Sequence, residues 1–178
     1  TFSNFNKVLP TTTVGIAGTF TPGTAVGHTV TNSNINFNGT VAQTVPVFPY
    51  EGLTIANNAG ATLGGNVTVN GALGLAAGTL AVGTNTLILN STVAATSGLL
   101  SSSATGTVNY NQASNGQNVL SANYGNLTFS NFNKVLPAGS VGIATVFTAG
   151  TATGHTITGN TINFNGSAAQ SIPVFTYN

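Results

Sequence analysis

Residues that could take part in acid–base chemistry are nearly absent from this sequence. Of its 178 residues, only Lys7, Lys134 and Glu51 carry a formal charge at neutral pH, and the titratable His28 and His155 complete the set. Acid–base cleavage of polysaccharides needs paired carboxylates, and a serine-type triad needs an acid that orients its histidine. A single carboxylate meets neither need. We therefore expect no enzymatic activity and no cofactor, with Glu51 a solvated turn residue.

The histidines and the lysines occur in matched sequence contexts. His28 and His155 both lie in Gly-His-Thr, whereas Lys7 and Lys134 both lie in Asn-Phe-Asn-Lys-Val-Leu-Pro. A zinc site needs three or four ligands, and the sequence has no Cys or Asp to add to the histidines. We expect structural or surface histidines, with weak metal binding between stacked copies as the alternative. The lysines are expected to be exposed at a sheet edge or turn, where their charge discourages wrong pairing.

A long internal repeat explains these matched contexts. Residues 1–51 and 128–178 align without a gap at an offset of 127 and are identical at 34 of 51 positions. A shorter phrase, in which an Asn-aromatic-Asn step precedes a Gln and then a Tyr, recurs at Gln43 and Tyr50, at Gln117 and Tyr124, and at Gln170 and Tyr177. Such repetition is typical of a stacked array. We divide the chain into modules 1–52, 53–126 and 127–178, which together form one continuous stacked domain.

Short apolar segments within the modules repeat at a nearly constant interval. Segments start at Val67, Leu73, Leu80 and Leu87. Their spacing predicts one circuit of three short strands in about 20 residues, at the short end of the known repeat periods. Period-two alternation is typical of strands, and the intervening Gly and Asn residues supply turns. We predict an all-β fold, a triangular parallel β-helix (β-solenoid) with about 20 residues per coil and Asn or Thr ladders at its corners.

The same interval recurs elsewhere, at Leu53 to Leu73 to Val93, Leu80 to Leu100, Asn70 to Asn90 and Leu127 to Phe147, while the step from Val141 to Ile162 is longer by one. A tandem of small β-sandwich modules is the alternative fold, although sandwich strands usually have about five or six residues. The phrase that carries the glutamines is expected to form an irregular connection or a bulged rung, since its Pro46 and Pro173 lack a ladder donor. Recurring aromatic residues such as Phe5 and Phe37 are expected in the core or as rung caps.

Composition limits the partners of the chain. A net charge of +1 provides no field that would attract nucleic acid or an anionic membrane. Every apolar run is interrupted within a few residues, so we expect no membrane span. Five sequons, at Asn38, Asn66, Asn90, Asn126 and Asn165, are candidate glycosylation sites.

The two ends of the sequence nearly continue each other. Tyr177 and Asn178 match Tyr124 and Gly125, while Thr1 matches Thr128, so only the equivalents of residues 126 and 127 are missing between them. We expect either a window of a longer repetitive polypeptide or separate chains that stack head to tail. Thr1, Phe2, Tyr177 and Asn178 are the candidate assembly ends. A start at Thr1 without Met suggests a processed or excised piece.

The run TVNYN…GQNVL…YGNLTF, together with LGGNVTVNGALGLAAGTLAVGTNTLIL, resembles the repeats of large secreted bacterial surface proteins of the adhesin and filamentous-haemagglutinin-like kind. The resemblance implies a β-solenoid that is exported, lies on or outside the cell and acts in adhesion, sheath or matrix formation. It identifies no functional residue in this chain.

From the residues and this resemblance we expect a non-enzymatic structural protein that forms an extracellular filament, sheath or surface fibre by stacking β-modules end to end, with itself as partner. An uncapped solenoid exposes strand edges, and low net charge removes repulsion between chains. Two alternatives stay open: an adhesin stalk segment that presents a binding domain elsewhere, and an ice- or carbohydrate-binding solenoid.

Overall fold

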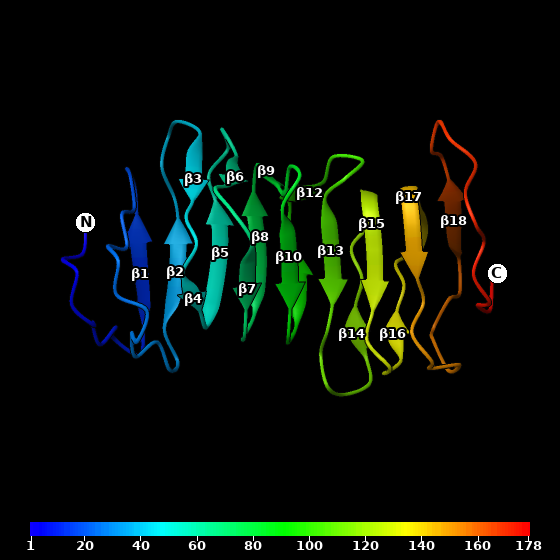
Figure 1. Cartoon of the computed structure of the whole chain (residues 1–178), viewed down its shortest axis with the longest axis horizontal. Helices are drawn as coiled ribbons and strands as arrows, with labels where there is room; N and C mark the ends of the chain where they lie inside the picture. The colour runs from blue at the N-terminus through cyan, green and yellow to red at the C-terminus, as the bar shows by residue number, and fades with distance from the viewer.

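The computed structural model describes residues 1–178 as a parallel β-solenoid of about eight turns, with eighteen strands and no helix. Figure 1 shows the strands side by side along the long axis, with the N-terminus at one end and the C-terminus at the other. Every strand pair is parallel. Because the strands of β-sandwich modules pair antiparallel, the alternative fold is excluded.

Three long sheets and one short sheet form the walls of the solenoid. The five-stranded sheet contains, in spatial order, β1 (Thr13–Ile16), β2 (Asn34–Phe37), β5 (Gly52–Ala56), β8 (Leu73–Ala77) and β11 (Val93–Ala95). The seven-stranded sheet contains β4 (Pro49–Tyr50), β7 (Val67–Val69), β10 (Thr86–Leu89), β13 (Thr107–Tyr110), β15 (Asn123–Phe129), β17 (Gly139–Thr148) and β18 (Asn160–Phe164). The four-stranded sheet contains β3 (Gln43–Val45), β6 (Ala61–Leu63), β9 (Thr79–Ala81) and β12 (Leu99–Ser101), and β14 (Gln117–Asn118) pairs with β16 (Lys134–Val135).

The register of the strands confirms the predicted coil length. Leu53 lies beside Leu73 and Leu73 beside Val93, so each residue meets its predicted partner one coil further along the chain. Leu80 lies beside Leu100, and Leu127 beside Phe147, at the same interval. The predicted longer step also occurs, since Val141 lies beside Ile162.

The two copies of the long repeat lie on different walls. β1 and β2 belong to the five-stranded sheet, whereas their equivalents β17 and β18 belong to the seven-stranded sheet. The offset of 127 between the copies is not a multiple of the coil length, so the second copy starts on another wall. Equivalent residues therefore make equivalent contacts along the axis while they face different sides of the solenoid.

Apolar side chains from equivalent positions fill the interior. In β5 and β8 the alternate residues Leu53, Ile55, Leu73 and Leu75 are buried, while the residues between them are half-buried on the outer face. The buried apolar side chains form one continuous cluster of 32 residues. Since each circuit buries its apolar face only against its neighbours, the turns stabilise one another along the axis.

Side-chain ladders link successive turns on the outside, as predicted for the corners. The Asn90 Nδ2 donates to Asn70 Oδ1 at 2.9 Å, and the Asn111 Nδ2 donates to Asn90 Oδ1 at 2.9 Å. The amide of Asn90 therefore accepts from one turn and donates to another.

The repeated glutamine forms a buried link between turns. The Gln117 Nε2 donates to the backbone carbonyls of Leu89 and Ser91 at 2.9 and 2.7 Å, and its Oε1 accepts from the Gln112 N–H at 3.2 Å. Gln43 and Gln170 make the corresponding bonds, with donor–acceptor distances between 2.7 and 3.2 Å. Part of this phrase is irregular, as expected, since residues 111–116 and 165–172 contain no strand, whereas β3 around Gln43 is regular.

The repeated tyrosine closes the loop that follows each glutamine. The hydroxyl groups of Tyr50, Tyr124 and Tyr177 each donate to the carbonyl four residues earlier, at 2.9, 2.7 and 3.0 Å. Phe37 and Tyr50 are buried, as predicted for the recurring aromatics, but Phe5 is exposed. Phe132, the equivalent of Phe5 in the second copy, is exposed as well, so this position faces outward in both copies.

Candidate assembly faces

The first and last turns present two apolar end faces. The N-terminal face surrounds a hollow of about 260 Å³ and is lined by Thr1, Phe2, Lys7, Val8, Leu9, Pro10, Val14, Ile16, Thr19, Phe20 and Ile35. The C-terminal face consists of β18 and residues 165–178 after it, and β18 is the edge strand of its sheet. The predicted end residues thus lie on opposite faces: Thr1 and Phe2 on one, Tyr177 and Asn178 on the other.

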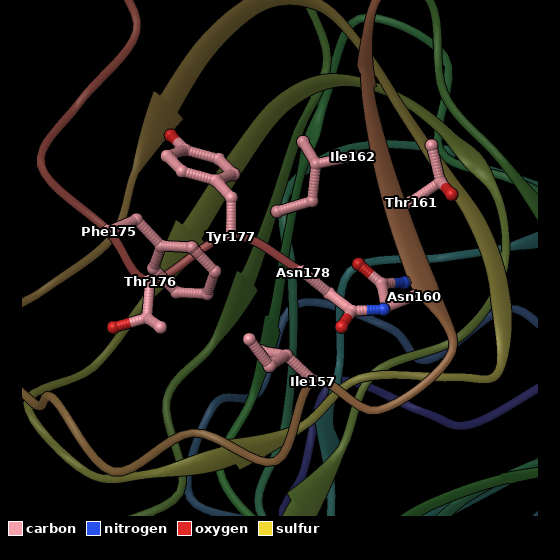
Figure 2. A pocket seen from close by; sticks show the side chains of 8 residues that line it. All are labelled: Ile157, Asn160, Thr161, Ile162, Phe175, Thr176, Tyr177 and Asn178. Atoms are coloured by element: carbon pink, nitrogen blue, oxygen red, sulfur yellow. The ribbon is translucent and has the colours of Figure 1, made fainter.

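The C-terminal face contains a small pocket of about 80 Å³ (Figure 2). Figure 2 shows the rings of Phe175 and Tyr177 and the side chains of Ile157 and Ile162 gathered around it. The Phe175 and Tyr177 ring centroids are 5.3 Å apart, and Phe164 lies 6.4 Å from Tyr177. These rings would add to the apolar surface that a further turn could cover.

The internal repeat shows what the N-terminal face lacks. Val141 and Ile143 in β17 are fully buried, whereas their equivalents in β1, Val14 and Ile16, are only half-buried. β17 has ten residues and lies between β15 and β18, whereas β1 has four residues and pairs with β2 alone. The difference arises because the turn that carries β15 precedes the second copy, and no corresponding turn covers the first.

The C-terminal face shows the complementary difference. Val119 is 3% exposed, whereas its equivalent Ile172 is 68% exposed. Tyr124 is 1% exposed, but Tyr177 is 39% exposed. Val119 and Tyr124 are covered by the turn that begins at Phe129. The two end faces therefore expose the two halves of a contact that the interior of the chain already makes.

The lysines are not the exposed edge residues that we expected. Lys134 is completely buried, and its Nζ donates to Ser130 Oγ at 2.7 Å. Burial lowers the pKa of Lys134 to about 8, because the charged form loses hydration. Lys7 makes the equivalent bond to Ser3 Oγ but is only half-buried, since its covering turn is absent. The prediction was wrong because the burial of Lys134 depends on a neighbouring turn and not on its own segment.

The histidines have structural roles. The backbone N–H of Lys134 donates to His155 Nδ1 at 3.0 Å, and Lys7 makes the same bond to His28. An accepting Nδ1 requires a neutral ring, and burial lowers the pKa of His155 accordingly. The rings also pack on aromatic residues, with centroids 5.0 Å apart for His28 and Phe48. No group of three His, Cys, Asp or Glu side chains lies together to hold a metal ion.

The sequon side chains fall into two groups. Asn38, Asn66 and Asn165 are exposed, whereas Asn90 and Asn126 are half-buried. In a glycosylated asparagine the side-chain nitrogen carries the glycan. The Asn90 Nδ2 already donates to Asn70 Oδ1, and the Asn126 Nδ2 donates to the backbone carbonyls of Thr105 and Gly106. Glycans at Asn38 and Asn66 would therefore disturb the turns least.

The fold defines the chain as an all-β parallel β-solenoid with about 20 residues per turn. Comparisons with protein-family models, with curated proteins and with solved structures found no match. No helix in the structure is long and apolar enough to cross a membrane. Sequence reasoning named the end residues but missed Val8, Ile16 and Ile172; aligning the two copies against the buried interior would have found them.

Proposed function

We propose that this chain is a non-enzymatic structural protein that stacks end to end through its two faces into a filament, sheath or surface fibre. One observation carries the proposal: residues buried in the interior copy of the repeat are exposed in the equivalent positions at the ends. A second copy of the chain, stacked head to tail, presents the matching surface to each face. An extracellular or cell-surface location is part of the proposal and rests on the resemblance of the repeats.

Burial of the apolar side chains at the two faces and new backbone hydrogen bonds would offset the cost of association. Complete burial of a side chain the size of Val or Ile contributes roughly 1.5–3 kcal/mol. Val8, Ile172 and Tyr177 are largely or partly exposed, and Val14 and Ile16 are half-buried, so their burial would contribute several kcal/mol together. Association costs about 4–15 kcal/mol in lost freedom of motion. The unpaired backbone groups at both faces supply a further ladder of hydrogen bonds.

The charge of the chain does not oppose this association. The net charge is +1, and the charged residues are two lysines and one glutamate. Repulsion between like copies is therefore weak at any salt concentration, and assembly should depend little on ionic strength.

Sedimentation velocity over a range of concentrations tests the proposal, with variants at exposed positions. Val8→Asp and Ile172→Asp place a charge at the N-terminal and C-terminal faces, while Leu99→Asp is the control at a comparably exposed position in β12, away from both ends. The unaltered chain and the Leu99 variant should form concentration-dependent oligomers, and each face variant should remain a monomer. A monomeric unaltered chain at high concentration would contradict the proposal.

A further inference from the structure

We infer that the junction between two stacked copies reproduces, residue for residue, the contact between residues 108–124 and 128–148 of the same chain. This inference rests on the proposed function and adds its register. Phe164 of one copy lies beside Phe2 of the next, Gln170 beside Lys7, and Tyr177 beside Ile16.

The internal contact supplies the three pairs. Tyr110 lies beside Phe129, Gln117 beside Lys134, and Tyr124 beside Ile143. The second members of these pairs correspond to Phe2, Lys7 and Ile16 at the offset of 127. The first members correspond to Phe164, Gln170 and Tyr177 through the shared phrase. The first copy of the phrase makes an equivalent pair: Phe37, which corresponds to Tyr110, lies beside Ile55, which corresponds to Phe129.

The strand register also sets the rotation between stacked subunits. β15 and β17 each extend over two walls, because Leu127 lies beside Phe147 near one end of β17, whereas β18 pairs with the other end of β17, at residues 139–143. Phe164 is therefore in line with Ile143 and Tyr124, one wall before Tyr110 and Phe129. Tyr177 follows Phe164 as Tyr124 follows Tyr110, by two walls, which places Tyr177 on the wall of the five-stranded sheet, where Ile16 lies. The five-stranded sheet of the next subunit thus continues the same wall, and successive subunits stack with almost no rotation.

The strand order also gives the length of the subunit repeat. The chain makes one turn from β1 to β2, two-thirds of a turn from β2 to β4, and four turns from Tyr50 in β4 to Phe129 in β15. Tyr124 lies one wall before Phe129, and Phe164 lies two turns after Tyr124, so β18 lies about seven and a third turns after β1. One further turn reaches Phe2 of the next subunit, and two-thirds of a turn then reaches its β1. One subunit therefore advances the solenoid by about nine turns.

The junction would enclose Lys7 as the interior encloses Lys134. Inside the chain, the Val119 N–H donates to the Val135 carbonyl at 2.9 Å, and the Gly116 N–H donates to the Asn133 carbonyl at 2.9 Å. These bonds hold the 112–119 segment over Lys134. The corresponding bond at the junction joins Ile172 to Val8, the two apolar residues that are 68% and 80% exposed in the single chain.

The surroundings of Gly142 and of its equivalent Gly15, on the outer surface of the solenoid, support the same register. The Asn165 Nδ2 donates to Asn123 Oδ1 at 3.1 Å across Gly142, where a Cβ would collide with the Asn123 side chain. In the first copy, Gly15 has only the Asn38 side chain nearby. The register places Thr176 of the preceding copy at the position of Asn123, so its hydroxyl can accept from Asn38 across Gly15.

Disulfide trapping tests the register, because the chain has no cysteine. The double variant Val8→Cys with Ser171→Cys places a thiol on each face, at positions equivalent to the neighbours Asn118 and Val135. Asn118→Cys with Val135→Cys is the internal positive control, and Val8→Cys with Thr96→Cys is the negative control. We expect a ladder of covalent oligomers from the first variant, an intrachain bond in the second and neither in the third.

The outcomes separate the two proposals. If the unaltered chain polymerises and the positive control oxidises while the Val8–Ser171 pair does not, the register is wrong and the assembly proposal stands. If no chain assembles, both proposals fail. Amine acylation of the unaltered chain gives a second test: Lys7 should react in dilute monomer and be at least tenfold protected after assembly, and Lys134 should be protected in both. Equal reactivity of Lys7 in monomer and polymer would overturn the register.

Discussion

Replacing Gln117 by leucine tests whether the buried glutamines hold successive turns together. The change removes the bonds from Nε2 to the Leu89 and Ser91 carbonyls and the bond from Gln112 N–H to Oε1. The Leu89 carbonyl keeps a partner, because the Asn111 N–H donates to it at 2.8 Å. The Ser91 carbonyl and the Gln112 N–H lose theirs. A buried group left without a partner costs about 1–3 kcal/mol, so the free energy of unfolding should fall by about 2–4 kcal/mol.

Urea unfolding followed by circular dichroism measures this loss, and Gln170→Leu is the matched control. Gln170 makes equivalent bonds to Ile143 and Thr145, but it lies at the open C-terminal face, where water can replace the lost partners. At monomer concentrations the control should lose less than about 1 kcal/mol. If the two variants lose equal stability, or if the Gln117 variant loses less than about 1 kcal/mol, the Gln117 side chain does not hold successive turns together.

Two further predictions concern buried titratable groups. Burial lowers the pKa of Lys134 from 10.5 to about 8, so the unfolded chain binds more protons than the folded chain between these values and stability rises with pH. The melting temperature of the unaltered chain should therefore increase between about pH 7.5 and about pH 9.5. The melting temperature of the Lys134→Met variant should stay constant over this range. If the melting temperature of the unaltered chain does not change with pH either, the Lys134 amine is hydrated and its pKa is not lowered. Tyr110→Phe removes the 2.8 Å bond between the hydroxyls of Tyr110 and Tyr124 and the acceptor of the Leu120 N–H. Its urea midpoint should fall by an amount equivalent to about 1–3 kcal/mol, and an unchanged midpoint would mean that another group satisfies Leu120.

The sequence predicted the fold well because the solenoid repeats one local pattern. The steps from Leu53 to Leu73 and from Leu73 to Val93 are visible as spacing, and spacing alone sets which residues share a column. The Asn70–Asn90 contact followed from the same arithmetic.

Contacts that depend on a particular neighbouring turn could not be predicted in this way. The hydrogen bonds of Gln117 reach carbonyls 26 and 28 residues earlier in the chain, across an irregular loop. Lys134 is buried and Lys7 is only half-buried, although residues 1–10 and 128–137, which contain them, are identical in sequence. Burial at these positions is decided by whether a covering turn exists.

Electron cryomicroscopy of the assembled protein tests the stacking account most directly. A continuous solenoid predicts rungs about 4.8 Å apart that run through the junction without interruption, with a subunit rise of about 43 Å and almost no rotation between subunits. The density at each junction should place the Tyr177 side chain beside Ile16 of the next copy. Filaments whose subunits meet side to side, or particles that remain single eight-turn rods, would contradict it.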